Sequence, residues 1–187
     1  MGAFFLGFVL LSTSCQAVEK KRIVEEISVN TFKHPASFSL NGGQLKLDKK
    51  LKRDFYLVDS AFILNVVPFE MNAGKYFWLV AKLPSKPKSF GKGFCGAGTE
   101  DYIYLIGFGD AKLVYVDRML TRSCLNNIEV GHGEDLGKEQ FAFEQNTGTV
   151  KFSQRRINET RTTVDELTLT PTSHKILQTA VRLKDAD

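Results

Sequence analysis

Residues 38–47 read Phe-Ser-Leu-Asn-Gly-Gly-Gln-Leu-Lys-Leu, and this stretch decides the fold class. Phe38 and Leu40 enclose one polar residue before the Asn-Gly-Gly triplet, and Leu45 and Leu47 enclose a lysine after it. Asparagine and glycine readily adopt the positive φ angles that a tight hairpin turn requires. Two alternating runs on either side of such a turn predict a β-hairpin.

The same pattern recurs near the C-terminus, where Phe141 and Phe143 precede an Asn-Thr-Gly triplet and Val150 and Phe152 follow it. This segment predicts a second hairpin. The remaining runs rich in β-branched and aromatic residues are expected to be strands. They are residues 55–67, 75–83, 102–108, 112–116, 164–170 and 176–183. In the fifth of these runs the alternation is partial, which suits a half-buried edge strand.

Many short strands without alternating helices predict an all-β fold rather than βαβ units. We expect an antiparallel sandwich or a barrel-like single domain with little helix, covering residues 22–187. The best helical candidates are residues 118–125 and the tail at 173–184. A length of 187 residues suits one domain, and 43% hydrophobic residues argue against intrinsic disorder.

The first fifteen residues read MGAFFLGFVLLSTSC and carry no charged side chain. This segment is too short for a transmembrane helix, which needs about 20 apolar residues. An apolar run followed by small residues is typical of a secretory signal peptide, with a buried N-terminal strand or helix as the alternative. We expect residues 1–14 to be removed on export and residues 15–21 to form a polar tether.

The residues before Cys15 resemble the lipobox of bacterial lipoproteins, in which small residues precede a cysteine that is lipidated and becomes residue one. Ser12 stands where the lipobox usually has an aliphatic residue, and Leu11 lies one position further away. The resemblance implies a lipid anchor at Cys15 and a place in the bacterial cell envelope, facing the periplasm or the cell exterior. The alternative is ordinary cleavage after Ala17, with Cys15 and Ala17 at the two positions that a signal peptidase reads.

The cysteine count agrees with export. The chain contains 3 cysteines, an odd number for a secreted protein unless one has another use. Lipidation of Cys15 leaves Cys95 and Cys124, which we expect to form a disulfide. On the chain-entropy argument, a bridge across about 30 residues stabilises a fold by roughly 3–4 kcal/mol. Two reduced and buried thiols of a cytosolic protein are the alternative.

Charge and motifs exclude several classes of function. A formal net charge of +4 over 187 residues is too small to predict nucleic-acid binding. The common motifs of serine hydrolases, zinc proteases, P-loop proteins and thiol oxidoreductases do not occur in the sequence. Residues 91–96 match G-x-G-x-x-G, but a strand-like run follows them where a dinucleotide site needs a helix. No cofactor is therefore expected.

The longest stretch without a strand pattern is residues 84–100, which contains two prolines and four glycines. Loops of more than about 12–15 residues in compact domains are usually functional or disordered. We expect this loop and the start of the next strand to form the binding surface, with a solvated connector as the alternative. The candidate binding residues are Lys86, Lys88, Phe90, Lys92, Phe94, Glu100 and Asp101.

Two acidic clusters define the alternative of a hydrolase. One is Glu100-Asp101, and the other is His132, Glu134 and Asp135 between glycines, where oxygen ligands can hold a divalent cation. Paired carboxylates cleave glycosidic bonds only when they face each other. Adjacent residues of a strand point to opposite faces, so Glu100 and Asp101 are not expected to form such a pair.

Together these features predict an exported, lipid-anchored envelope protein that acts by non-catalytic binding, as an inhibitor, an immunity protein or an assembly accessory. This role is inferred from the class of protein and not from a motif. Its expected partner is a protein or an envelope polymer, and nucleic acid is not expected. An envelope hydrolase and a purely structural envelope lipoprotein are the two alternatives.

Overall fold

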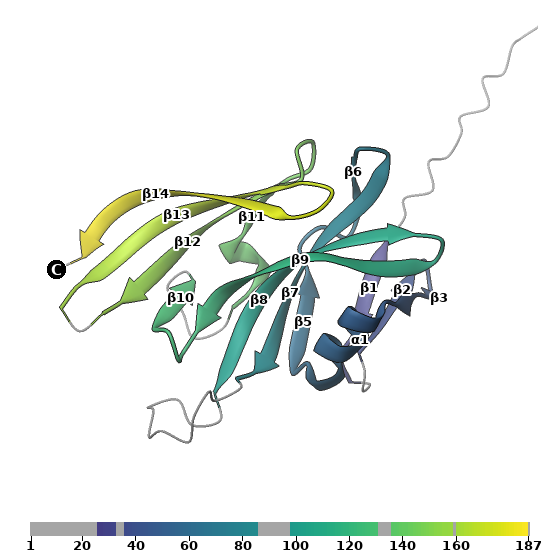
Figure 1. The fold of residues 1–187 in the computed structure, drawn as a ribbon, viewed down its shortest axis with the longest axis horizontal. Coiled ribbons are helices and arrows are strands. Elements are labelled where there is room, and N and C mark those ends of the chain that lie inside the picture. Colours follow the sequence, from purple (N-terminus) through teal and green to yellow (C-terminus); the bar gives the residue numbers. More distant parts are fainter. Residues whose placement is uncertain (1–25, 33–35, 86–97, 131–135, 159, 187) are drawn as a thin grey trace, which may run out of the picture.

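The computed structural model describes residues 26–32, 36–85, 98–130, 136–158 and 160–186. It is an all-β protein with one large, mainly antiparallel sheet and one small sheet, which confirms the predicted class (Figure 1). The large sheet does not close on itself. The barrel-like alternative is therefore wrong, whereas a sandwich-like arrangement is consistent with the structure.

The small sheet has the order β1-β2-β3, and the main path of the large sheet has the order β14-β13-β12-β10-β9-β8-β7-β5. Beside this path, β11 pairs with β12, β6 pairs with β7, and β4 pairs in parallel with β9. The strands are β1 (Ile27–Asn30), β2 (Ser37–Leu40), β3 (Gly43–Gln44), β4 (Lys46–Leu47), β5 (Ser60–Ile63), β6 (Phe69–Met71), β7 (Gly74–Pro84), β8 (Thr99–Gly109), β9 (Lys112–Ser123), β10 (Ile128–Val130), β11 (Ala142–Glu144), β12 (Thr149–Ile157), β13 (Thr162–Pro171) and β14 (Ile176–Ala186). The helical elements are α1 (Lys49–Asp54), η1 (Phe55–Leu57) and η2 (Lys138–Gln140).

Both predicted hairpins form. In the first, Asn41 (φ 48°) and Gly42 (φ 82°) make a two-residue turn that places Leu40 opposite Gly43. The second joins β11 to β12, with Phe143 opposite Val150. After the first hairpin the chain leaves the small sheet, and β4 pairs with β9 instead.

Two helical predictions and one edge-strand prediction are wrong. Residues 118–125 lie mainly in β9, and residues 176–184 of the predicted C-terminal helix belong to β14. Residues 164–170 lie within β13, which is flanked by β12 and β14, so β14 and not β13 forms the edge.

The helix α1 was not predicted, because a single buried leucine, Leu51, leaves no periodic pattern in six residues.

One carboxylate joins α1 to the large sheet. Asp48 caps the helix, since its Oδ1 accepts the N–H of Leu51 at 2.7 Å. Its Oδ2 accepts the N–H of Tyr115 in β9, also at 2.7 Å. Asp48 therefore holds the start of the helix against the middle of the sheet.

The strands β7 and β8 form the central layer, because they are buried on both faces. On one face, alternate residues of β7 such as Phe77 and Leu79 pack against the small sheet, α1 and η1. On the other face, Trp78 and Val80 pack against β12 and β13, which the sheet brings back over its own centre. Continuous apolar runs in both strands are what burial on both faces requires.

Candidate functional site

A cleft of about 720 Å³ opens at the end of the central layer where β7 begins and β8 ends. Its floor is a row across three strands, in which Tyr76 pairs with Gly107 and Gly107 pairs with Val114. Gly107 has no side chain to rise above the floor. A Cβ there would lie in contact with its neighbours, 3.6 Å from both the Tyr76 ring and Val116. A Cβ at Gly109 would meet no atom within 4 Å. The cleft is therefore an open trough whose floor has no side chain at Gly107 or Gly109.

Basic side chains surround this floor. Lys46, Lys75 and Lys112 line the cleft together with one acidic residue, Asp110. The parallel pairing of β4 with β9 places Lys46 opposite Lys112, although 66 positions separate them in the sequence. The lining therefore carries three lysines against one carboxylate, which favours an anionic ligand.

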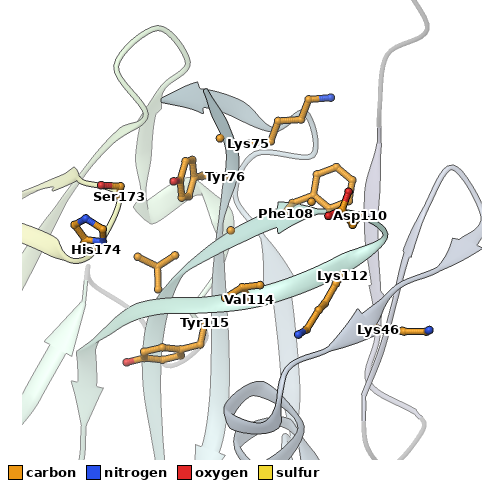
Figure 2. Close-up of a pocket in the computed structure, with 14 residues that line it drawn as sticks. Lys46, Lys75, Tyr76, Phe108, Asp110, Lys112, Val114, Tyr115, Ser173 and His174 are labelled. Carbon is orange, nitrogen blue, oxygen red and sulfur yellow. The ribbon is translucent and has the colours of Figure 1, made fainter. Parts of the chain in front are cut away.

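The turn between β13 and β14 contributes the opposite end of the cleft. Figure 2 shows Ser173 and His174 at one end, Lys46 and Lys112 at the other, and Val114 between them. This turn is held in place because the N–H of Ile176 donates to Asp117 Oδ2 on β9 at 2.9 Å. The cleft thus joins elements from distant parts of the sequence.

The helix α1 supports the cleft from the other face of the sheet. Tyr115 lines the cleft, and the Lys50 ammonium lies 3.2 Å from the centre of its ring. A cation over an aromatic face is worth about 0.5–1 kcal/mol at exposed sites. The Asp48 carboxylate fixes the backbone of the same tyrosine. The unpredicted helix therefore braces, from behind, the strand that carries part of the floor.

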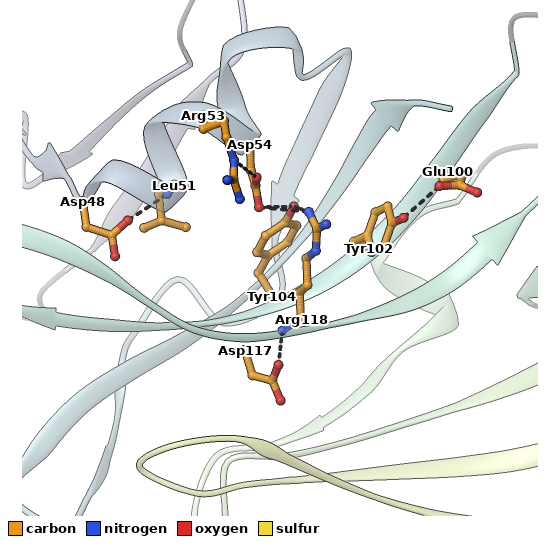
Figure 3. A network of polar contacts seen from close by, with 9 residues as sticks. All are labelled: Asp48, Leu51, Arg53, Asp54, Glu100, Tyr102, Tyr104, Asp117 and Arg118. Atoms are coloured by element: carbon orange, nitrogen blue, oxygen red, sulfur yellow. Dashed lines mark hydrogen bonds and ion pairs between the residues drawn. The ribbon is translucent and has the colours of Figure 1, made fainter. Parts of the chain in front are cut away.

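Glu100, a predicted site residue, belongs to a polar network on the face that α1 covers (Figure 3). Its carboxylate accepts the Tyr102 hydroxyl at 2.8 Å and the Ser123 hydroxyl at 3.0 Å. The Arg118 guanidinium lies 4.5 Å from the centre of the Tyr102 ring. Burial, followed by the neighbouring Glu100, raises the pKa of Tyr102 to about 12, so its hydroxyl stays protonated at neutral pH.

The second half of this network ties α1 to the sheet. Arg118 Nη1 donates to Asp54 Oδ2 and to the Tyr104 hydroxyl, each at 2.9 Å. Asp54 is the last residue of α1, and its side chain is only 7% exposed. Burial raises the pKa of Tyr104 well above its ordinary value. The Tyr102 and Tyr104 phenols therefore surround the ion pair between Arg118 and Asp54. We assign this network the role of fixing the end of α1 to the sheet.

Asp101 lies on the opposite face of β8, as the alternation of the strand predicts. The register places it between Lys82 and Arg122, and its carboxylate is 3.7 Å from the Arg122 Nε atom. Glu100 lies instead in the row of Leu83 and Ser123. The two neighbouring acids therefore do not face each other as the carboxylates of a glycosidase do.

Burial raises the pKa of Asp101 above its ordinary value of 3.8, against the opposing charges of Arg122 and Lys82. For an acid with a raised pKa, the contribution to stability is present below the ordinary pKa and is lost as pH rises through the raised one. Asparagine does not titrate, so Asp101→Asn should gain stability relative to the natural chain as pH rises above the ordinary pKa of 3.8. Urea unfolding at a series of pH values measures this, and a difference in unfolding free energy that does not change with pH would contradict it.

Several predicted residues lie outside the described part of the chain, so their predictions stay untested. These are Cys15, Lys86, Lys88, Phe90, Lys92, Phe94, Cys95, His132, Glu134 and Asp135. Cys124 directly follows β9, and its pairing with Cys95 remains a prediction. Within the described ranges, no three His, Cys, Asp or Glu side chains are grouped closely enough to hold a metal ion. None of the described helices is long and apolar enough to cross a membrane.

No protein-family model matches the chain, and no curated protein or solved structure is detectably similar to it. The function must therefore be argued from the geometry of the chain itself.

Sequence reasoning missed the cleft because its lining comes from four separate segments. The one local pattern that pointed to it is Gly107-Phe108-Gly109, where two glycines on the same face of a strand leave that face without side chains. The lysines came together only through the pairing of β4 with β9 and of β7 with β8.

Proposed function

We propose that this protein is a non-catalytic binding module of a bacterial cell envelope and that the cleft holds a segment of an acidic polysaccharide. The observation that carries the proposal is the combination of a floor built from Tyr76, Gly107 and Val114 with the lysines that line the same cleft. Aromatic and apolar surface suits the flat face of a sugar ring, and ammonium groups form charge-assisted hydrogen bonds with carboxylates. An open trough suits a polymer, which enters and leaves at the two ends.

The proposed location rests on the segment before Cys15, which resembles a lipobox, and on the cysteines. Glu100 pairs with Ser123, so Cys124 lies beside the start of β8, and Cys95 is only four residues before Thr99. This proximity supports a Cys95–Cys124 disulfide, and disulfides persist in oxidising compartments such as the periplasm. A tethered binding module can act as an inhibitor, an immunity protein or an assembly accessory in that compartment.

The test compares two pairs of lysine substitutions. Lys46→Gln together with Lys112→Gln removes two charges from the cleft, and an alginate oligosaccharide should then bind about tenfold more weakly, a loss of ~1.4 kcal/mol. Lys138→Gln with Lys151→Gln is the matched control, because both lysines are exposed and neither lines the cleft. Isothermal titration calorimetry at low salt measures both pairs, since salt screens exposed charges.

A third variant tests the floor separately from the charges. Gly109→Leu places a side chain in open space, so the fold should remain stable while the trough is filled. Alginate should then bind at least tenfold more weakly, as judged by calorimetry. Equal loss of affinity in the control lysine pair, or equal binding of a neutral malto-oligosaccharide, would show that the cleft is not an acidic-glycan site.

A further inference from the structure

The last strand, β14, ends the large sheet with one side unpaired among the described residues. It pairs with β13 from Pro171↔Ile176 to Thr162↔Ala186, and within the described chain no strand pairs with its other side (Figure 1). At its start, the Ile176 N–H donates to Asp117 of β9. Residues 177–183 are all exposed, on both faces of the strand. Such an edge carries a row of backbone donors and acceptors that can pair with another strand.

The middle of this edge carries none of the devices that usually protect an edge strand. Residues 177–181 read Leu-Gln-Thr-Ala-Val, without proline or charge. Natural edges are usually protected by charged side chains, proline or a bulge. The only irregularity in the pairing of β13 with β14 lies further along, between Val164 and Asp165, opposite Leu183. The uncharged part of the edge is thus regular and open.

The outer face of this edge is apolar. The register places Leu177, Thr179 and Val181 opposite Thr170, Thr168 and Glu166 of β13, so these three side chains share one face. Leu177 is 43% exposed and Val181 is 61% exposed. Two apolar side chains therefore stand in solvent on either side of a threonine.

We propose that β14 pairs with β14 of a second copy of this chain, antiparallel, with the two Thr179 residues opposite each other on a two-fold axis. In this register each Leu177 lies opposite Val181 of the second copy, so both exposed apolar side chains are covered in each chain. Gln178 lies opposite Ala180, and the pairing ends before Ile176, whose backbone N–H is already donated to Asp117 Oδ2. No two like charges oppose each other, and Arg182 keeps its ion pair with Asp165.

Neighbouring registers are less favourable. A pairing centred on Ala180 places Leu177 opposite Leu183, which sits at the bulge, and Gln178 opposite Arg182. A pairing centred on Gln178 places Val181 opposite Lys175 and leaves Leu177 opposite Thr179. Residues that lie opposite each other in paired strands project their side chains to the same face of the sheet. A register between these three would pair residues from opposite faces, so such registers are excluded. The register centred on Thr179 is the one that pairs the apolar residues with each other.

This dimer would be relevant to binding, although the proposal does not rest on the function of the cleft. The turn that enters β14 contributes Ser173 and His174 to the cleft. Two paired copies therefore carry two clefts on one continuous sheet. A polymer that reaches both clefts gains avidity without any new contact.

Cysteine cross-linking of the full-length protein tests the register. Thr179→Cys should form a covalent dimer after mild oxidation, because the two thiols face each other across the axis. Gln178→Cys is the matched control, since it faces Ala180 of the second copy and points to the other face of the sheet. A mixture of Leu177→Cys and Val181→Cys should give a mixed dimer that is at least tenfold more abundant than the dimer from either variant alone, as seen by non-reducing electrophoresis and mass spectrometry. The unsubstituted chain shows the background from its own cysteines.

Sedimentation equilibrium tests the dimer without cross-linking. The natural chain should dimerise reversibly, and Val181→Lys should weaken the dimer at least tenfold by removing the apolar pair. Leu57→Lys is the control, because this exposed leucine lies in η1, away from the edge. A natural chain that stays monomeric at several hundred micromolar, or equal cross-linking at positions 178 and 179, would overturn the proposal.

Discussion

Replacing Trp78 by alanine is expected to destabilise the fold by about 3–5 kcal/mol, as large-to-small changes of buried aromatic residues generally do. The Trp78 side chain is fully buried in the core between β7–β8 and β12–β13. Its Nε1–H donates to the Gly148 carbonyl oxygen at 2.6 Å, and its backbone N–H donates to Asn65 Oδ1 at 2.7 Å. The residue therefore fills the space between the two halves of the sheet and also connects them.

Trp78→Phe separates the packing from the hydrogen bond. Phenylalanine keeps most of the apolar volume but leaves the buried Gly148 carbonyl without its donor, which costs about 1–3 kcal/mol. Urea unfolding followed by circular dichroism measures both variants, since the alanine variant lacks the single tryptophan whose fluorescence would otherwise serve. A loss below about 1 kcal/mol for Trp78→Ala would contradict the assignment of this residue to the core.

Replacing Gly148 by alanine should cost about 2–4 kcal/mol. Gly148 has φ +67°, a conformation that residues with a Cβ rarely adopt, and an added Cβ would collide with the ring of Phe69. The ring is buried, so the collision cannot be relieved by moving the side chain into solvent. Both the backbone and the packing therefore oppose the substitution.

Gly42→Ala is the matched control. Gly42 also has a positive φ, +82°, but an added Cβ there meets no atom within 4 Å. Only the backbone cost of about 1–2 kcal/mol for a Cβ at positive φ should appear. Comparing the two variants by urea unfolding isolates the collision with Phe69. Equal losses in both variants would show that the packing around Gly148 is not tight.

The Gly148 variant also bears on the cleft. Phe69 lies against the Tyr76 ring, with 6.0 Å between the ring centres, and Tyr76 forms part of the floor of the cleft. A displaced Phe69 would shift that ring. A loss of alginate affinity in Gly148→Ala would therefore be an indirect effect of core packing, whereas Gly109→Leu tests the cleft without disturbing the core.

The strands were predictable where the chemistry is local. The turn at Asn41-Gly42 and the hairpin around Gly148 follow from residues that tolerate positive φ between alternating runs. The central strands β7 and β8 follow from long apolar and β-branched runs. Residues 118–125 were misassigned because their own composition is compatible with a helix, whereas their pairing with β8 makes them a strand. The edge assigned to residues 164–170 moved to β14, since edge position depends on which strand pairs next.

The candidate site was only partly predictable. Sequence reasoning placed Glu100 and Asp101 in the site and on opposite faces of a strand, and the structure does put them on opposite faces, Glu100 among Tyr102 and Ser123 and Asp101 beside Arg122. It did not find the cleft, because Lys46, Lys75 and Lys112 are unremarkable alone. These lysines line one cleft because β4 pairs in parallel with β9 and because β7, β8 and β9 lie side by side in the sheet. No local sequence pattern specifies those pairings.

Local sequence was thus sufficient for the all-β class, for both hairpin turns and for the central strands, because alternation and positive φ are properties of neighbouring residues. Folding alone decided which lysines share a cleft, that α1 braces Tyr115, and that β14 is left with an open edge. These features arise from pairings between segments far apart in the chain, and the free energy of such pairings depends on the whole sheet.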